Sequence, residues 1–112
     1  MTAVHQFCSI GDHAFVAGGS LVRKDIPPFV KAAREPLSYA GVNSVGLRRR
    51  GFDSDKIKEI QSIYRILYQK NFNNTQATQI IEAEMEASTE RDDILQFIRQ
   101  SQRGIMKGYL QN

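Results

Sequence analysis

The sequence has little of several features that usually point to secretion or to a membrane. It contains a single cysteine, Cys8, so no disulfide can form within the chain, and this suits a reducing compartment. No apolar run approaches the length of a membrane span, and no basic-then-apolar secretory signal opens the chain. We therefore expect a soluble cytoplasmic protein without a membrane-spanning segment.

The positive charge of the chain is unevenly distributed. Apolar residues make up 41% of the chain, enough for a packed core, and the net charge is +3. Residues 1–52 carry seven Lys/Arg against three Asp/Glu, whereas residues 53–112 carry eight against nine. Part of the excess is the run Arg48-Arg49-Arg50. A compact cluster favours a local anionic ligand over a broad face for duplex phosphates, although a solvated basic turn stays an alternative.

Residues 1–26 contain a six-residue repeat. Aliphatic residues recur at every sixth position, at Val4, Ile10, Val16 and Val22. This period is neither helical nor that of a simple strand, and it predicts a solenoid in which one aliphatic side chain per hexad points inward. The pattern opens without an N-terminal cap, so we expect these coils to have been cut from a longer solenoid.

Residues 27–52 are predicted to form ordered but irregular chain. Pro27 and Pro28 should end the solenoid, because proline cannot donate to a sheet ladder and disfavours helix before it. Pro36 and several glycines interrupt the remainder. Long irregular loops in compact proteins are usually functional or disordered, and the apolar content of this one indicates that it packs.

Residues 53–112 change to helical spacing and predict a C-terminal helical domain. Apolar residues recur at helical intervals behind three possible N-caps. We expect the three helices to begin at Asp53 or Ser54, near Thr75, and at Ser88 or Thr89. The first should stop near residues 71–74 and the third near Gly104. Short connections between them predict an antiparallel bundle.

Four strings in this order resemble the C-terminal part of bacterial UDP-N-acetylglucosamine O-acyltransferases. They are Thr2–Phe7, Asp25–Phe29, Gly41–Asn43 and Gly46–Phe52. The resemblance is sharp to about residue 70 and looser through the helices. It implies the last coils of a left-handed parallel β-helix followed by a helical bundle, assembled as a homotrimer.

The resemblance also implies a reaction. Members of this family transfer a 3-hydroxyacyl group from acyl carrier protein to UDP-N-acetylglucosamine (UDP-GlcNAc) in the first step of lipid A, and so lipopolysaccharide, biosynthesis. No metal and no dissociable cofactor takes part. A histidine of an earlier coil acts as general base, and neither His5 nor His13 matches it. We therefore expect this chain alone to lack acyl transfer.

The matched residues suggest a substrate site. Resemblance assigns His5, Gln6, Asn43, Arg49 and Arg50 to the nucleotide sugar. Guanidinium groups bind phosphate through bidentate, permanently charged forks, and imidazole and amide groups can donate to phosphate or sugar oxygens. For each of them the competing interpretation is an ordinary surface or turn residue satisfied by its neighbours.

Two further positions qualify this assignment. Gly18 matches a position on the groove for the acyl chain, although a solenoid corner also explains a glycine there. Val45 stands where family members often carry a glutamate, so a different pattern of contacts to the ribose is expected.

Several other functions compete with this one. The chain could belong to another hexapeptide-repeat acyltransferase, such as the N-acyltransferase of the lipid A pathway, although the paired arginines before the helices favour the O-acyl enzyme. It could also be a non-enzymatic trimerising module. A nucleic-acid-binding domain is disfavoured, since the helices are near neutral and no aromatic residues line a basic groove.

Overall fold

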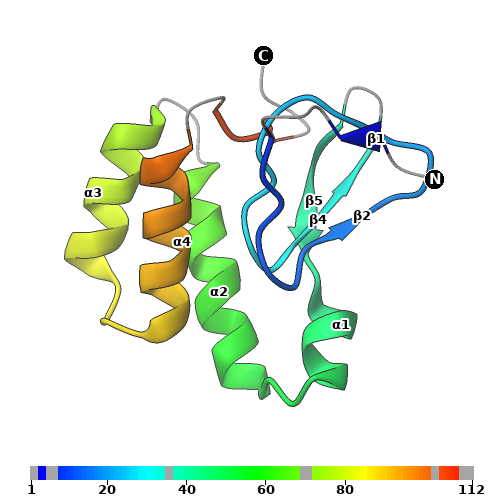
Figure 1. Cartoon of the computed structure of the whole chain (residues 1–112). Helices are drawn as coiled ribbons and strands as arrows, with labels where there is room; N and C mark the ends of the chain where they lie inside the picture. The colour runs from blue at the N-terminus through cyan, green and yellow to red at the C-terminus, as the bar shows by residue number, and fades with distance from the viewer. Residues whose placement is uncertain (1–2, 5–7, 35–36, 69–71, 102–103, 109–112) are drawn as a thin grey trace.

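A computed structural model describes residues 3–4, 8–34, 37–68, 72–101 and 104–108. The first part of the chain forms short strands, and the second part forms helices (Figure 1). The strands are β1 (Ala3–Val4), β2 (Phe15–Val16), β3 (Leu21–Val22), β4 (Val30–Ala33) and β5 (Ser38–Val42). We refer to these strands and the segments between them as the β region.

Strand pairing in the β region follows the six-residue repeat at its start. β1 pairs in parallel with β3, and Val4 is the register partner of Val22, which lies three hexads further along the chain. Val22 is fully buried, as the repeat predicts. Ile10 instead is 43% exposed and pairs with Ile26, so the inward-pointing prediction is wrong for this residue.

Ile10 and its partner Ile26 are 16 residues apart, two fewer than Val4 and Val22, and the neighbouring Gly11 lies against Pro28. A Cβ placed on Gly11 would lie 2.4 Å from the backbone nitrogen of Pro28, so the chain passes very close to the proline pair here. Gly11 is therefore required by close approach and not by a positive φ. The turn at Gly19 does use a positive φ, of 79°.

The prediction of irregular chain over residues 27–52 is wrong. β4 pairs in parallel with β2 and antiparallel with β5, and helix α1 (Ser44–Arg49) follows directly. Val30 and Ala32 are buried while Lys31 between them is exposed, which is the alternation of a strand with one covered face. The pattern is too short to stand out in the sequence, and the strand forms because β2 and β5 supply partners.

Three longer helices complete the fold. Helix α2 (Ser54–Leu67) begins after the predicted cap Asp53, whose side chain accepts from the Lys56 amide, and ends a turn earlier than expected. Helix α3 (Asn74–Glu84) is capped by Asn73 in a capping box with Gln76, and not by Thr75. Helix α4 (Thr89–Gln100) is capped by Ser88 and ends before Gly104.

Helix α2 lies between the β region and the other two long helices (Figure 1). Its buried face carries Ile57, Ile60, Ile63, Tyr64 and Leu67. It contacts β5 and α1 on one side and α3 and α4 on the other. One apolar core therefore runs from the strands into the helices, and α2 links the two parts.

The segment after α4 returns to the β region. The amide of Asp25 donates to the Gly104 carbonyl at 2.8 Å, and the amide of Met106 donates to the Asp25 carbonyl at 3.0 Å. The buried carboxylate of Asp25 also accepts from the Ser9 amide at 2.7 Å and from the Ser101 hydroxyl. The last described residues are thus an extended segment attached to the coils, and they form no helix.

Candidate functional site

Asn43 lies where β5 ends and α1 begins. Its side-chain oxygen accepts from the Gly46 amide at 3.3 Å, which makes Asn43 the N-cap of the helix. Its side-chain nitrogen donates to the His13 carbonyl at 3.1 Å. An amide oxygen has two lone pairs and the nitrogen has two hydrogens, so one acceptor site and one donor hydrogen remain for a ligand.

Arg49 and Arg50 lie at the other end of α1, and both are exposed. Arg49 is the last helical residue and Arg50 is the C-cap, where cationic side chains are favoured by the helix carbonyls. The short helix holds both guanidinium groups and Asn43 within two turns of each other. The structure therefore brings together three of the five residues that the resemblance assigned to the nucleotide sugar.

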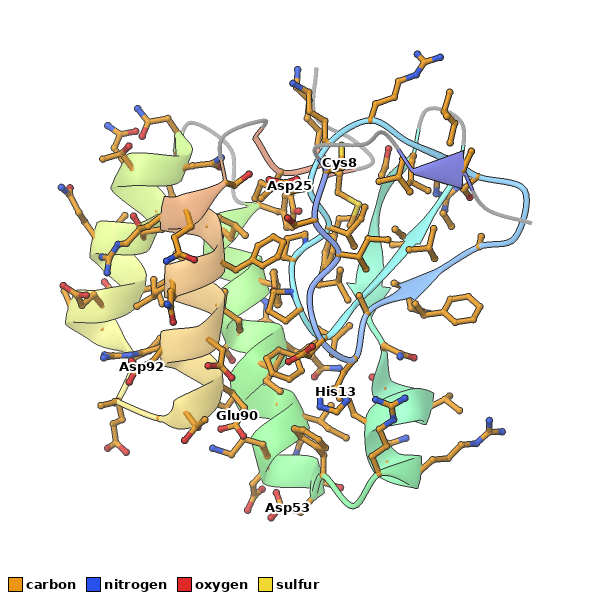
Figure 2. All side chains as sticks on the ribbon, in the orientation of Figure 1. Cys8, His13, Asp25, Asp53, Glu90 and Asp92 are labelled. Carbon is orange, nitrogen blue, oxygen red and sulfur yellow. The ribbon has the colours of Figure 1, made fainter. Side chains whose placement is uncertain are left out.

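His13 joins this group, although the sequence analysis did not select it. Its ring stacks on Phe29 with centroids 5.7 Å apart and meets Phe52 edge-on at 5.3 Å. Its Nδ1 atom lies 2.5 Å from Nη1 of Arg50. Figure 2 shows His13 at the end of the β region that faces α1 and α2. No motif marks this histidine, because its neighbours come from two segments that are distant from it in the sequence.

These residues surround a pocket of about 470 Å³. It is lined by His13, Ala14, Phe15, Lys31, Asn43, Val45, Gly46, Arg49 and Arg50. Among the described residues that line it, three are Lys or Arg and none is a carboxylate. Phe15 and Val45 add an apolar wall and are 55% and 61% exposed. The pocket is thus suited to an anion attached to a less polar group.

Lys31 is a second residue of the pocket that no sequence motif marks. It is the register partner of Phe15, so strand pairing sets both side chains beside each other on the outer face of the sheet. The alternation along β4 puts it on the exposed face, but four residues are too few for that pattern to stand out in the sequence.

The remaining predicted residues are not part of this pocket as described. His5 and Gln6 lie outside the described residues. Gly18 is exposed in the turn between β2 and β3, and a Cβ added to it would meet no atom within 4 Å. Arg48 is exposed on α1 but does not line the pocket.

In the described part of the chain, no three His, Cys, Asp or Glu side chains come together as a metal ion would need. None of the helices described has the length and apolar content needed to cross a membrane.

Comparison with known proteins gives one consistent family. A family model described as "Udp N-acetylglucosamine O-acyltransferase; Domain 2" matches residues 25–106. A curated acyl-[acyl-carrier-protein]–UDP-N-acetylglucosamine O-acyltransferase from Herminiimonas arsenicoxydans is 44% identical over 110 residues, covering 95% of this chain. Its counterpart from Myxococcus xanthus is 38% identical over 107 residues, covering 96% of the chain.

Comparison with solved structures points to the same family. The UDP-N-acetylglucosamine acyltransferase of Bacteroides fragilis superposes with a TM-score of 0.92 at 46% identity, over 95% of this chain and 42% of that one. The enzyme of Francisella novicida gives 0.88 at 35% identity, over 97% and 40%. The chain spans 42% of the length of each of the two curated relatives named above.

Proposed function

This chain belongs to the UDP-N-acetylglucosamine O-acyltransferase family, and we propose that it is the C-terminal part of an enzyme that acylates UDP-GlcNAc. The reaction is transfer of a 3-hydroxyacyl group from acyl carrier protein to the glucosamine 3-hydroxyl, the first step of lipid A biosynthesis. The observation that carries the proposal is the carboxylate-free pocket in which Asn43, Arg49 and Arg50 meet. We infer a cytoplasmic location, in keeping with the single cysteine.

The pocket would hold the nucleotide part of the substrate. The guanidinium groups of Arg49 and Arg50 offer paired donors and positive charge to the pyrophosphate. The free donor and acceptor of Asn43 are available to the nucleoside. Val45 offers the ribose no acceptor, so the sugar hydroxyls would be bound more weakly on that side. His5 and Gln6 would complete the site, and Gly18 would line the acyl groove.

Acyl transfer also needs a general base, which we assign to a coil outside these 112 residues. There, a histidine takes the proton of the sugar hydroxyl, and the oxygen attacks the thioester carbonyl carbon. A carbon–oxygen bond forms, the carbon–sulfur bond breaks, and the thiol of the carrier's phosphopantetheine arm leaves with a proton. His13 is a poor candidate for this base because its Nδ1 is engaged by Arg50 and its ring packs on two phenylalanines.

We further propose that the β region is the end of a left-handed parallel β-helix in a homotrimer, with the helices as its C-terminal bundle. Parallel pairing at a spacing of three hexads supports the coil. Apolar side chains on the outside of the coils support a subunit interface, since Ile10, Phe15 and Leu21 are 41–55% exposed. Light scattering would then give three times the chain mass of 12.7 kDa.

The proposal is tested by calorimetry with UDP-GlcNAc on the chain and on the Arg49→Ala/Arg50→Ala variant. Binding that the double substitution abolishes supports the pocket as the nucleotide site. Arg48→Ala is the matched control, because this arginine is on the same helix but outside the pocket, and it should bind normally. A double variant that binds like the wild type contradicts the assignment, and acyl transfer by the chain alone contradicts the placement of the base.

A further inference from the structure

The His13 ring is held in one orientation by its surroundings. It stacks on Phe29 with an interplanar angle of 12° and packs edge-on against Phe52 with an interplanar angle of 71°. Its backbone has a φ of 62°, in the left-handed region that histidine and asparagine enter more readily than most side chains. Three separate segments thus converge to fix the direction in which its ring nitrogens point.

That direction determines which atom faces Arg50. Nδ1 lies 2.5 Å from Nη1 of the arginine, and a guanidinium can only donate. The imidazole must therefore accept through Nδ1 and carry its hydrogen on Nε2. One N–H of Arg50 is used in this contact, and its remaining N–H donors are free for a ligand in the pocket.

The backbone of the same residue holds the second polar group of the pocket. The His13 carbonyl accepts from the side chain of Asn43, whose oxygen meanwhile caps α1. His13 therefore contacts both ends of the short helix, one through its ring and the other through its main chain. Asn43 and Arg50 are thus linked through His13 as well as along the helix.

We propose that His13 is a positioning residue that preorganises the anion site, by orienting the Arg50 guanidinium through Nδ1 and the Asn43 amide through its carbonyl. The inference rests on the proposed function, because it concerns the same pocket. An arginine held in place loses less side-chain freedom when a phosphate binds, so the contact raises affinity without touching the ligand.

Two substitutions at His13 distinguish loss of the hydrogen bond to Arg50 from loss of the fold. His13→Asn keeps an acceptor at the position of Nδ1, whereas His13→Gly removes it, and both residues tolerate the positive φ and both lose the ring. With UDP as the probe, we expect His13→Gly to weaken binding about tenfold and His13→Asn to recover most of that loss. In an Arg50→Ala background, the glycine substitution should cause no further loss through the side-chain contact.

The outcomes distinguish the two proposals. If Arg50→Ala leaves UDP binding unchanged, the proposed nucleotide site is wrong. If Arg50→Ala weakens binding but His13→Gly and His13→Asn both bind like the wild type, the role of His13 is wrong and the site stands. Equal loss in the glycine and asparagine variants would also overturn the positioning role, since the acceptor then makes no difference.

A second measurement needs no ligand. Nitrogen-15 spectra of the histidine side chains should give the Nε2–H tautomer for His13, with an Nδ1 resonance that shifts on Arg50→Ala. An Nδ1 resonance that does not respond to the loss of Arg50 would overturn the contact even if UDP fails to bind. Circular dichroism of each variant checks that the fold is retained.

Discussion

The hydroxyl of Tyr64 donates a hydrogen bond of 2.6 Å to the carbonyl of Pro28, across 36 residues of sequence. Tyr64 is fully buried in the C-terminal half of α2, and Pro28 belongs to the proline pair just before β4. The bond therefore connects the helices to the β region inside the shared core. It also fixes the position of the segment that leads to Phe29 and to the His13 stack.

Tyr64→Phe should destabilise the chain by about 1–3 kcal/mol, because the buried Pro28 carbonyl loses its donor. The measurement is the free energy of unfolding in urea. Ser62→Ala is the control, since this hydroxyl bonds to its own helix at Lys58 on an exposed face, and it should change stability by less than about 0.5 kcal/mol. Equal effects of the two substitutions would show that the Tyr64 contact contributes little.

Stability should fall in alkaline solution because of the tyrosine cluster. The ring of Tyr39 stacks on Tyr68 with centroids 4.4 Å apart, and burial raises the pKa of Tyr39 from 10.0 to about 12, against a smaller lowering by the Arg65 charge. Burial also raises the pKa of Tyr64 and of Tyr68.

The sign of this effect follows from the direction of the shift. A phenol whose pKa is higher in the folded state supports the fold fully below its unfolded pKa, and that support is lost as the pH rises from 10.0 through about 12. Urea unfolding across this range should give a steeper decline for the wild type than for Tyr39→Phe. Parallel declines would mean that Tyr39 ionises normally in the folded chain.

Gly11→Ala should destabilise the coils by about 1–3 kcal/mol, because the new methyl would overlap the backbone of Pro28. Gly18→Ala is the matched control in the same coils, since its Cβ would meet no atom within 4 Å, and it should change stability by less than about 0.5 kcal/mol. Thermal or urea unfolding checks both. In a complete enzyme, Gly18→Ala should instead favour shorter acyl donors, which tests the proposed groove.

Gly46→Ala should affect ligand binding more than stability. A Cβ at this position would lie 2.5 Å from the side-chain nitrogen of Asn43 and would displace the amide from its two hydrogen bonds. Removing glycine from a helix stabilises it by about 0.5–1 kcal/mol, which offsets the lost cap. We expect UDP affinity to fall about fivefold to tenfold by calorimetry.

The control for this prediction is Ser44→Ala in the same helix. The Ser44 hydroxyl makes only a long contact of 3.4 Å to the Val42 carbonyl, so UDP affinity should stay close to that of the wild type. A Gly46→Ala variant that binds UDP normally would mean that the Asn43 amide is not needed in its observed position.

Features that depend on neighbours in the chain were determined by the sequence alone. Asp53 and Ser88 each stood among two predicted caps, because a cap bonds to an amide three residues away, and the structure shows that these two are the caps. The resemblance assigned the arginine pair and Asn43 to a substrate site, which stays a proposal, and the structure places all three at one pocket. The six-residue repeat predicted that Val22 points inward, and its side chain is fully buried.

Features that depend on distant partners were decided only by the tertiary structure. β4 and β5 formed where irregular chain was expected, because each strand needs a partner that local pattern does not reveal. His13 acquired its place from Phe29, Phe52 and Arg50, which no spacing rule connects. Helix caps and six-residue repeats depend on residues that are close together in the sequence. The shape of this pocket depends on side chains up to 37 residues apart that meet only in the folded chain.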